Sequence, residues 1–255
     1  MSNGSEPLAA QPQAPSAPKT WGYLATLGWV LLAYVVASAA AFVTFYLWDP
    51  ATIPTDLDFS GLMKNARYFS LSTIVTNVFL VAFLIWTAWI PGRRPNEYLA
   101  LNWAPRQEVV IALISLAVLL PLLDVMAYLA GQPIIPPFMV DIYGNAKATG
   151  SLPLLWLAVV VAAPVAEEVV FRGFIFRGWV RPSQRPMVGI LLVTAFFAVI
   201  HIQYNWFGIL QVFLIGFLLT WTRWRSSSTL VSMLLHFITN FYAMLQVIIY
   251  IDWMS

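Results

Sequence analysis

The segment LLWLAVVVAAPVAEEVVFRGFIFRGW, residues 154–179, decides how this chain folds. It is long and apolar enough to cross a bilayer, which takes about 20 residues of helix. Inside it, two adjacent carboxylates, Glu167 and Glu168, are followed by Arg172. An ionised side chain at mid-bilayer costs about 2.5–3.5 kcal/mol on insertion scales. Three such side chains within six residues indicate a site for chemistry rather than packing alone.

The composition is that of an integral membrane protein. Of the 255 residues, 60% are hydrophobic and 9% are charged, whereas a soluble domain is about 25% charged. The chain has no cysteine, which excludes a disulfide framework, a thiol nucleophile and a cysteine-ligated metal. The net charge of +2 gives no reason to expect a nucleic acid partner. The expected surroundings are a lipid bilayer.

Apolar segments recur along the chain and predict an all-α, polytopic membrane helical bundle of about seven to eight transmembrane helices. The segments long enough to span are 23–48, 69–90, 109–129, 154–179, 187–203, 207–224 and 230–250. The partly apolar stretch 134–153 has room for an extra short or re-entrant helix. Residues 1–19, rich in Pro, Ala, Gln and Ser, predict a disordered tail without a cleavable signal peptide. Residues 20–255 form one expected domain, with its functional centre in 154–250.

The basic residues predict the orientation of this bundle. When alternate loops are assigned to the cytoplasm, nine Lys and Arg side chains fall on one side and three on the other, with Arg172 set aside. The nine are Lys19, Arg93, Arg94, Arg106, Arg177, Arg181, Arg185, Arg223 and Arg225. An excess of basic residues marks the cytoplasmic face. We therefore expect a cytoplasmic N-terminus and an outside C-terminus. The short, compact, cysteine-free chain further indicates a bacterial inner (cell) membrane.

Helical spacing divides the charges of the central span. Residues four apart share a helix face, so Glu168 and Arg172 are expected to form an ion pair. Glu167 points in another direction and is left free to act as a general base, a role that burial favours. The alternative is that both glutamates only hold helices together across a polar gap.

The only two histidines lie in later apolar segments and have polar or aromatic neighbours at the same spacing. His201 follows Phe197 by four residues, and His236 precedes Asn240 by four. A lone buried histidine is more often a hydrogen-bonded core residue than a catalyst. An interhelical hydrogen bond of that kind is worth only about 0.6 kcal/mol within membranes. The joint occurrence of these groups with Glu167 favours a shared site.

The three motifs together resemble those of the CPBP (Abi, CAAX prenyl protease 2-like) intramembrane proteases. The order is Glu-Glu-x-x-x-Arg, then Phe-x-x-x-His, then His-x-x-x-Asn, on three apolar segments. The residues that carry it are Glu167, Glu168, Arg172, Phe197, His201, His236 and Asn240, with Gly173 after the arginine. The resemblance covers about 154–250; the first three spans match only in being membrane helices.

This resemblance implies an intramembrane endopeptidase that hydrolyses a membrane-associated or lipid-modified peptide near the cytoplasmic leaflet. Glu167 and His201 would activate a water, and His236 and Asn240 would stabilise the oxyanion. A second account makes Glu167, His201 and His236 ligands of a divalent metal, usually zinc, as in a metalloprotease. Zinc catalysis needs about three N or O ligands and an open water position. Both accounts fit the residues.

Other functions compete with proteolysis. A transporter could use the acidic and histidine groups as a proton relay, but the chain lacks internal repeat symmetry. A non-catalytic scaffold or bacteriocin-immunity protein would keep the fold and bind a partner. Asp124, a further intramembrane carboxylate, is open to three roles: lining the same cavity, binding protons, or bonding a neighbouring helix. The structural role is favoured for it. The sequence identifies neither the physiological substrate nor the oligomeric state.

Overall fold

A computed structural model describes residues 20–48, 64–92, 94–180 and 186–254. These residues form helices and connecting turns, and no strand occurs among them. Six helices in this part of the chain are long and apolar enough to span a membrane. They are α1 (Tyr23–Trp48), α3 (Ala66–Trp89), α5 (Arg106–Leu129), the composite helix Leu152–Trp179, α11 (Trp206–Ser226) and α12 (Thr229–Ile248), which continues into η4 (Ile249–Met254). The all-α membrane bundle is therefore confirmed, and the predicted tail 1–19 lies outside the described residues.

Shorter helices complete the bundle. α4 (Pro95–Tyr98) connects α3 to α5, and α6 (Pro137–Ala148) is the extra helix predicted between 134 and 153. The expected span 187–203 is instead α10 (Pro186–Val199), a helix of 14 residues. At 1.5 Å per residue it is about 21 Å long, short of a typical 30 Å hydrocarbon layer.

The predicted end of that span at 203 is wrong because the chain turns back there. The His201 backbone N–H donates to the Ala198 carbonyl, and the Tyr204 N–H donates to the His201 carbonyl. Asn205 then caps α11, its side chain accepting from the Gly208 N–H at 2.9 Å. These three-residue turns end α10 at Val199 and let α11 pack beside it. His201 therefore lies in the turn that connects α10 to α11.

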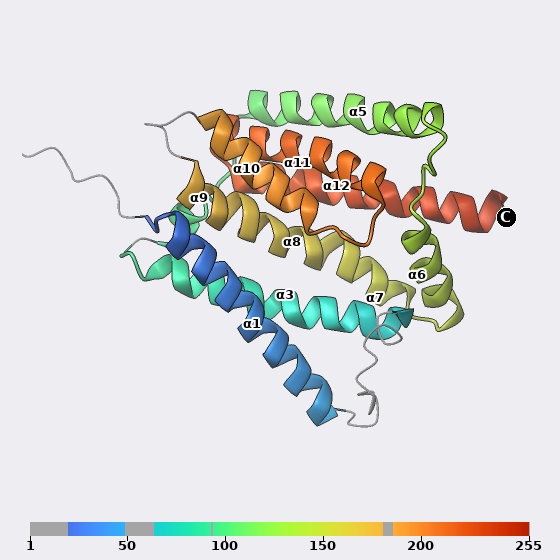
Figure 1. The fold of residues 1–255 in the computed structure, drawn as a ribbon, viewed down its shortest axis with the longest axis horizontal. Coiled ribbons are helices and arrows are strands. Elements are labelled where there is room, and N and C mark those ends of the chain that lie inside the picture. The colour runs from blue at the N-terminus through green and yellow to red at the C-terminus, as the bar shows by residue number, and fades with distance from the viewer. Residues whose placement is uncertain (1–19, 49–63, 93, 181–185, 255) are drawn as a thin grey trace, which may run out of the picture.

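The composite helix Leu152–Trp179 is the centre of the molecule. It consists of α7 (Leu152–Trp156), η2 (Leu157–Ala162), α8 (Ala163–Glu168), η3 (Val169–Ile175) and α9 (Phe176–Trp179), of which η2 and η3 are π-helical. In Figure 1, α1 and α3 lie on one side of it, and α10, α11, α12 and α5 lie on the other. Short π-helical stretches inside α-helices occur frequently at functional sites. The carboxylate pair lies at the junction of α8 and η3.

Packing around this helix differs sharply from packing at the periphery. Val170, Phe171 and Phe174 are fully buried against Leu80 of α3 and Leu99. By contrast, large apolar side chains of α1 and α5 are exposed. These include Leu24, Val35, Ile114, Val118 and Leu122. An apolar exterior around a packed interior is what a lipid bilayer requires, so the chain is an integral membrane protein.

Candidate hydrolytic site

The Glu168–Arg172 ion pair predicted from helical spacing is present and fully buried. Arg172 Nη1 donates to Glu168 Oε1 at 2.8 Å, and both side chains have 0% exposure. The guanidinium also donates through Nη2 to the Gly216 carbonyl of α11 at 3.1 Å. It lies 4.2 Å from the centroid of the Phe197 ring, a cation–π contact. Arg172 therefore ties the central helix to α10 and α11.

Glu168 has a second partner that the spacing argument did not reveal. Its Oε1 also lies 2.8 Å from Nδ1 of His236 on α12. A carboxylate only accepts, so His236 Nδ1 carries the proton and donates it to Glu168. The supporting carboxylate is thus shared between a buried arginine and a histidine. It holds that imidazole in place as well as neutralising Arg172.

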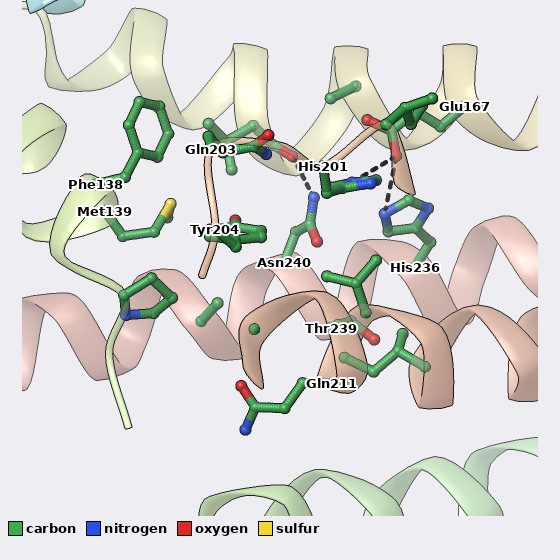
Figure 2. A pocket seen from close by; sticks show the side chains of 18 of the residues that line it. Phe138, Met139, Glu167, His201, Gln203, Tyr204, Gln211, His236, Thr239 and Asn240 are labelled. Carbon is green, nitrogen blue, oxygen red and sulfur yellow. Dashed lines mark hydrogen bonds and ion pairs between the residues drawn. The ribbon is translucent and has the colours of Figure 1, made fainter. Parts of the chain in front are cut away.

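Glu167 points away from that pair, as predicted, toward the two histidines (Figure 2). Its Oε2 lies 3.8 Å from His201 Nε2 and 3.7 Å from His236 Nε2. The same oxygen is buried and has no hydrogen-bond partner among the described residues. The structure therefore brings together three groups that are far apart in the sequence, at separations slightly longer than a hydrogen bond.

The tautomer of His201 follows from its own contact. Its Nδ1 lies 2.7 Å from the Phe197 carbonyl, which only accepts, so Nδ1–H is the donor. In their neutral forms, both imidazoles then present an Nε2 lone pair toward Glu167. Three acceptor atoms that face one another are suited to share a species with protons to donate, such as a water molecule.

Phe197 and His201 were expected on one face of a continuous helix, and this is wrong because α10 ends at Val199. They still meet, since the His201 ring lies 4.8 Å from the Phe197 ring and bonds its carbonyl. The Phe197 ring also lies 5.9 Å from the His236 ring. Phe197 thus separates the site from Arg172 and contacts both histidines.

Asn240 lies one turn beyond His236 on α12 and faces the same space (Figure 2). One proton of its Nδ2 is donated to the Val159 carbonyl in η2 at 2.8 Å. The amide nitrogen has two protons, so one donor remains for another partner. The bond to Val159 fixes the direction of that donor.

A cavity of about 510 Å³ connects these groups. Its lining includes Glu167, His201, His236 and Asn240 and continues to Asp124 on α5. Asp124 takes two of the roles left open for it: it lines the same cavity, and it bonds Tyr242 and Gln246 of the neighbouring helix α12.

Several lining residues were missed by the sequence reasoning. Four polar residues of α3 line the cavity, namely Ser72, Thr73, Thr76 and Asn77. Their spacing of three and four residues in an otherwise apolar helix was a detectable signal. Tyr204 also lines it, with its ring stacked against His201 at 6.2 Å. Burial and the nearby Glu167 carboxylate raise the pKa of Tyr204 to about 12, so it remains a neutral phenol.

The donor types suit a zinc ion, but their spacing does not. Metal-bound histidines usually donate the second ring N–H to a carboxylate or a carbonyl, as His236 and His201 do here. Ligand atoms about 2.0–2.1 Å from tetrahedral zinc lie roughly 3.3–3.4 Å apart, closer than the 3.7 and 3.8 Å found here. No group of three or more His, Asp or Glu side chains in the described part of the chain is arranged to hold a metal ion.

The fold and this cluster define a polytopic helical membrane protein whose Glu/His/His/Asn site lines a cavity. Residues 149–242 match the family described as type II CAAX prenyl endopeptidase Rce1-like. This segment contains all three motifs, and the match confirms the resemblance found in the sequence. The chain is also 29% identical over 183 residues to an uncharacterized 24.3 kDa protein of Escherichia coli, covering 69% of this chain and 78% of that protein. No solved structure matches it.

Proposed function

We propose that this protein is an intramembrane endopeptidase that hydrolyses a peptide bond of a membrane-associated peptide. One observation carries the proposal: Glu167 Oε2 lies within 3.8 Å of the Nε2 atoms of both His201 and His236, beside a cavity of about 510 Å³. The match of residues 149–242 to an endopeptidase family supports the same reaction class. The roles of individual residues are our assignment.

Glu167 and His201 are proposed to activate a water. Glu167 is the only carboxylate of the pair without a cationic partner, because Arg172 bonds Glu168. It takes one proton from the water while the water oxygen bonds to the peptide carbonyl carbon. His201, whose Nδ1–H is bound to a carbonyl, offers its Nε2 lone pair to the second water proton and orients the nucleophile.

His236 and Asn240 are proposed to stabilise the oxyanion that forms as the peptide carbonyl is attacked. His236 donates Nδ1–H to the Glu168 carboxylate, which balances a positive charge on its ring. A His236 ring that has taken up a proton at Nε2 from solvent before the peptide binds can donate Nε2–H to the oxyanion, and it keeps that proton throughout the step. The remaining Asn240 N–H is a second donor. Glu167 then returns its proton to the leaving amine, and the peptide bond breaks.

This division of labour explains why the two histidines have different anchors. The partner of His201 is a neutral backbone carbonyl, whereas the partner of His236 is an anion. A neutral anchor suits an imidazole that accepts, and an anionic anchor suits one that becomes a cation. Since the spacing does not match that of zinc ligands, no step of this proposal runs through a metal.

Cleavage by purified protein tests the proposal. Membrane peptides reconstituted in vesicles are incubated with wild type, Glu167→Ala, His236→Ala and Glu108→Gln, and products are identified by mass spectrometry. Glu108 is a carboxylate of α5 paired with Arg225, outside the cavity lining, and serves as the matched control. We expect products with wild type and the control only. Cleavage by the Glu167 and His236 variants at the wild-type rate would refute the assignment.

A metal measurement on the same samples tests the second account of the site. Metal content is determined for wild type and Glu167→Ala, and cleavage is repeated after chelation. The proposal predicts that chelation leaves the rate unchanged. If chelation removes a bound ion and cleavage stops, the water-activation step proposed here is wrong and the second account, with a metal, takes its place. The endopeptidase function itself is unaffected by that result.

A further inference from the structure

The cavity has a second polar centre that peptide hydrolysis does not use. Asp124 lines the cavity from α5, and its Oδ2 accepts hydrogen bonds from both Tyr242 Oη–H and Gln246 Nε2–H of α12. The Gln246 contact measures 2.9 Å. The other carboxylate oxygen, Oδ1, makes no hydrogen bond to any described residue. Two neutral donors therefore orient the group and leave half of it available to a ligand.

The charge of the cavity is unbalanced. Its described lining residues include two carboxylates, Asp124 and Glu167, and neither a lysine nor an arginine. Arg172, the buried cation of the central helix, bonds Glu168 and does not line the cavity. The only other titratable side chains in the lining besides tyrosines are His201 and His236, which belong to the hydrolytic site. A cavity with this lining favours a positively charged ligand.

Helix pairing alone does not account for a charge at this position. An asparagine at 124 would also accept hydrogen bonds from Tyr242 and Gln246. A carboxylate within a span costs about 2.5–3.5 kcal/mol more than an apolar residue on insertion scales. A cation that binds to the carboxylate would offset this free-energy cost.

We propose that Asp124 binds a cationic group of the substrate, either the ammonium or guanidinium of a Lys or Arg side chain or a free N-terminal amine. This proposal rests on the proposed endopeptidase function and specifies its substrate class: peptides with a basic group at a set distance from the cleaved bond. Tyr242 and Gln246 are positioning residues that hold the carboxylate toward the cavity.

The distance follows from the rise of α12. Tyr242 and Gln246 lie six and ten residues beyond His236, which corresponds to about 9 and 15 Å along the helix. An extended peptide advances about 3.3–3.6 Å per residue. A basic group bound at Asp124 therefore belongs to a residue roughly two to four positions from the cleaved bond.

A positional scan tests the proposal. One lysine is moved through a neutral peptide substrate, and each rate is divided by the rate for the same peptide with norleucine. Half of the peptides are N-acetylated, which separates a side-chain cation from a terminal amine. We expect wild type to prefer lysine at two to four positions from the cleaved bond by about tenfold or more, the size of one charge-assisted hydrogen bond. Asp124→Asn should bring the ratio close to 1, and Glu108→Gln should leave it unchanged.

Each result of the scan is informative. A wild-type ratio near 1 at every position, or an unchanged ratio in Asp124→Asn, overturns the proposal. If Asp124→Asn does not fold, the wild-type scan decides the proposal together with Tyr242→Phe. This variant keeps the charge of Asp124 but removes one of its two hydrogen-bond donors, so it is expected to weaken the preference for lysine without abolishing it. Binding of the same peptides to Glu167→Gln, followed by fluorescence, separates the two proposals. A lysine preference in binding without cleavage by wild type would sink the proteolytic function and keep the cation site.

Discussion

Replacing Glu168 by glutamine should destabilise the protein strongly, because it leaves Arg172 as an unpaired charge in the interior. Both side chains have 0% exposure, and their contact measures 2.8 Å. The guanidinium would keep only the Gly216 carbonyl and the Phe197 ring as partners. Breaking a buried ion pair by removing one partner costs about 3–5 kcal/mol. At about 2–4 °C per kcal/mol for a chain of this size, the expected fall in Tm is roughly 6–20 °C.

The double variant Glu168→Gln/Arg172→Met separates stability from catalysis. Removing both charges should recover most of the lost stability, since neutral replacements of buried pairs are often tolerated. Thr220 Oγ1 continues to donate to the Gly216 carbonyl, so that carbonyl keeps a partner. The double variant should still cleave about 10–100-fold more slowly than wild type, because His236 has lost the anion that orients it.

Two measurements on the same purified samples check this reasoning: thermal unfolding in detergent and the rate of peptide cleavage. A Glu168→Gln protein as stable as wild type would refute the buried ion pair. Full recovery of activity in the double variant would refute the role of the Glu168–His236 hydrogen bond.

Three further predictions follow from other contacts. Gly216→Ala would place a Cβ 2.8 Å from Phe197 Cδ1, so stability should fall by about 1–3 kcal/mol together with cleavage. Gly28→Ala, where no atom lies within 4 Å, should not destabilise and is the unfolding control. The pKa of Tyr204 is raised to about 12 in the folded protein, whereas an unfolded tyrosine ionises near pH 10. As pH rises from about 10 to 12, Tyr204 therefore ionises first in the unfolded chain, and the free energy of unfolding falls. Tyr204→Phe should flatten that part of the pH profile of stability. Arg223 Nε donates to the Arg172 carbonyl at 3.0 Å, so Arg223→Met should lower the Tm more than Arg225→Met. Arg225 pairs with Glu108 at an exposed position.

The sequence predicted the parts of this molecule that depend on composition and short-range spacing. Apolar length gave six of the seven expected spans, and the four-residue spacing gave the Glu168–Arg172 pair. It also left Glu167 facing another direction, toward the histidines. Each of these follows from the geometry of a single helix, which a linear pattern records.

Features that depend on contacts between helices were not predictable in this way. The bond between Glu168 and His236 joins residues 68 positions apart. The end of α10 at Val199 depends on the turn that brings α11 alongside, which an apolar pattern running through Ile200 and Ile202 conceals. Arg223 was counted with the cytoplasmic charges, yet its side chain is buried against η3. The orientation of the bundle stays a prediction.

The central claim is that Glu167 is the base of a hydrolytic centre, and Glu167→Gln tests it most directly. This variant keeps the size of the side chain and removes its basicity, and the Glu168–Arg172 pair is untouched. The measurement is the rate at which wild type and variant cleave one reconstituted peptide, after thermal unfolding has shown that the two proteins have the same Tm. We predict a loss of about 10²–10⁴-fold, the usual contribution of a general base. A Glu167→Gln protein that cleaves at the wild-type rate would contradict the account.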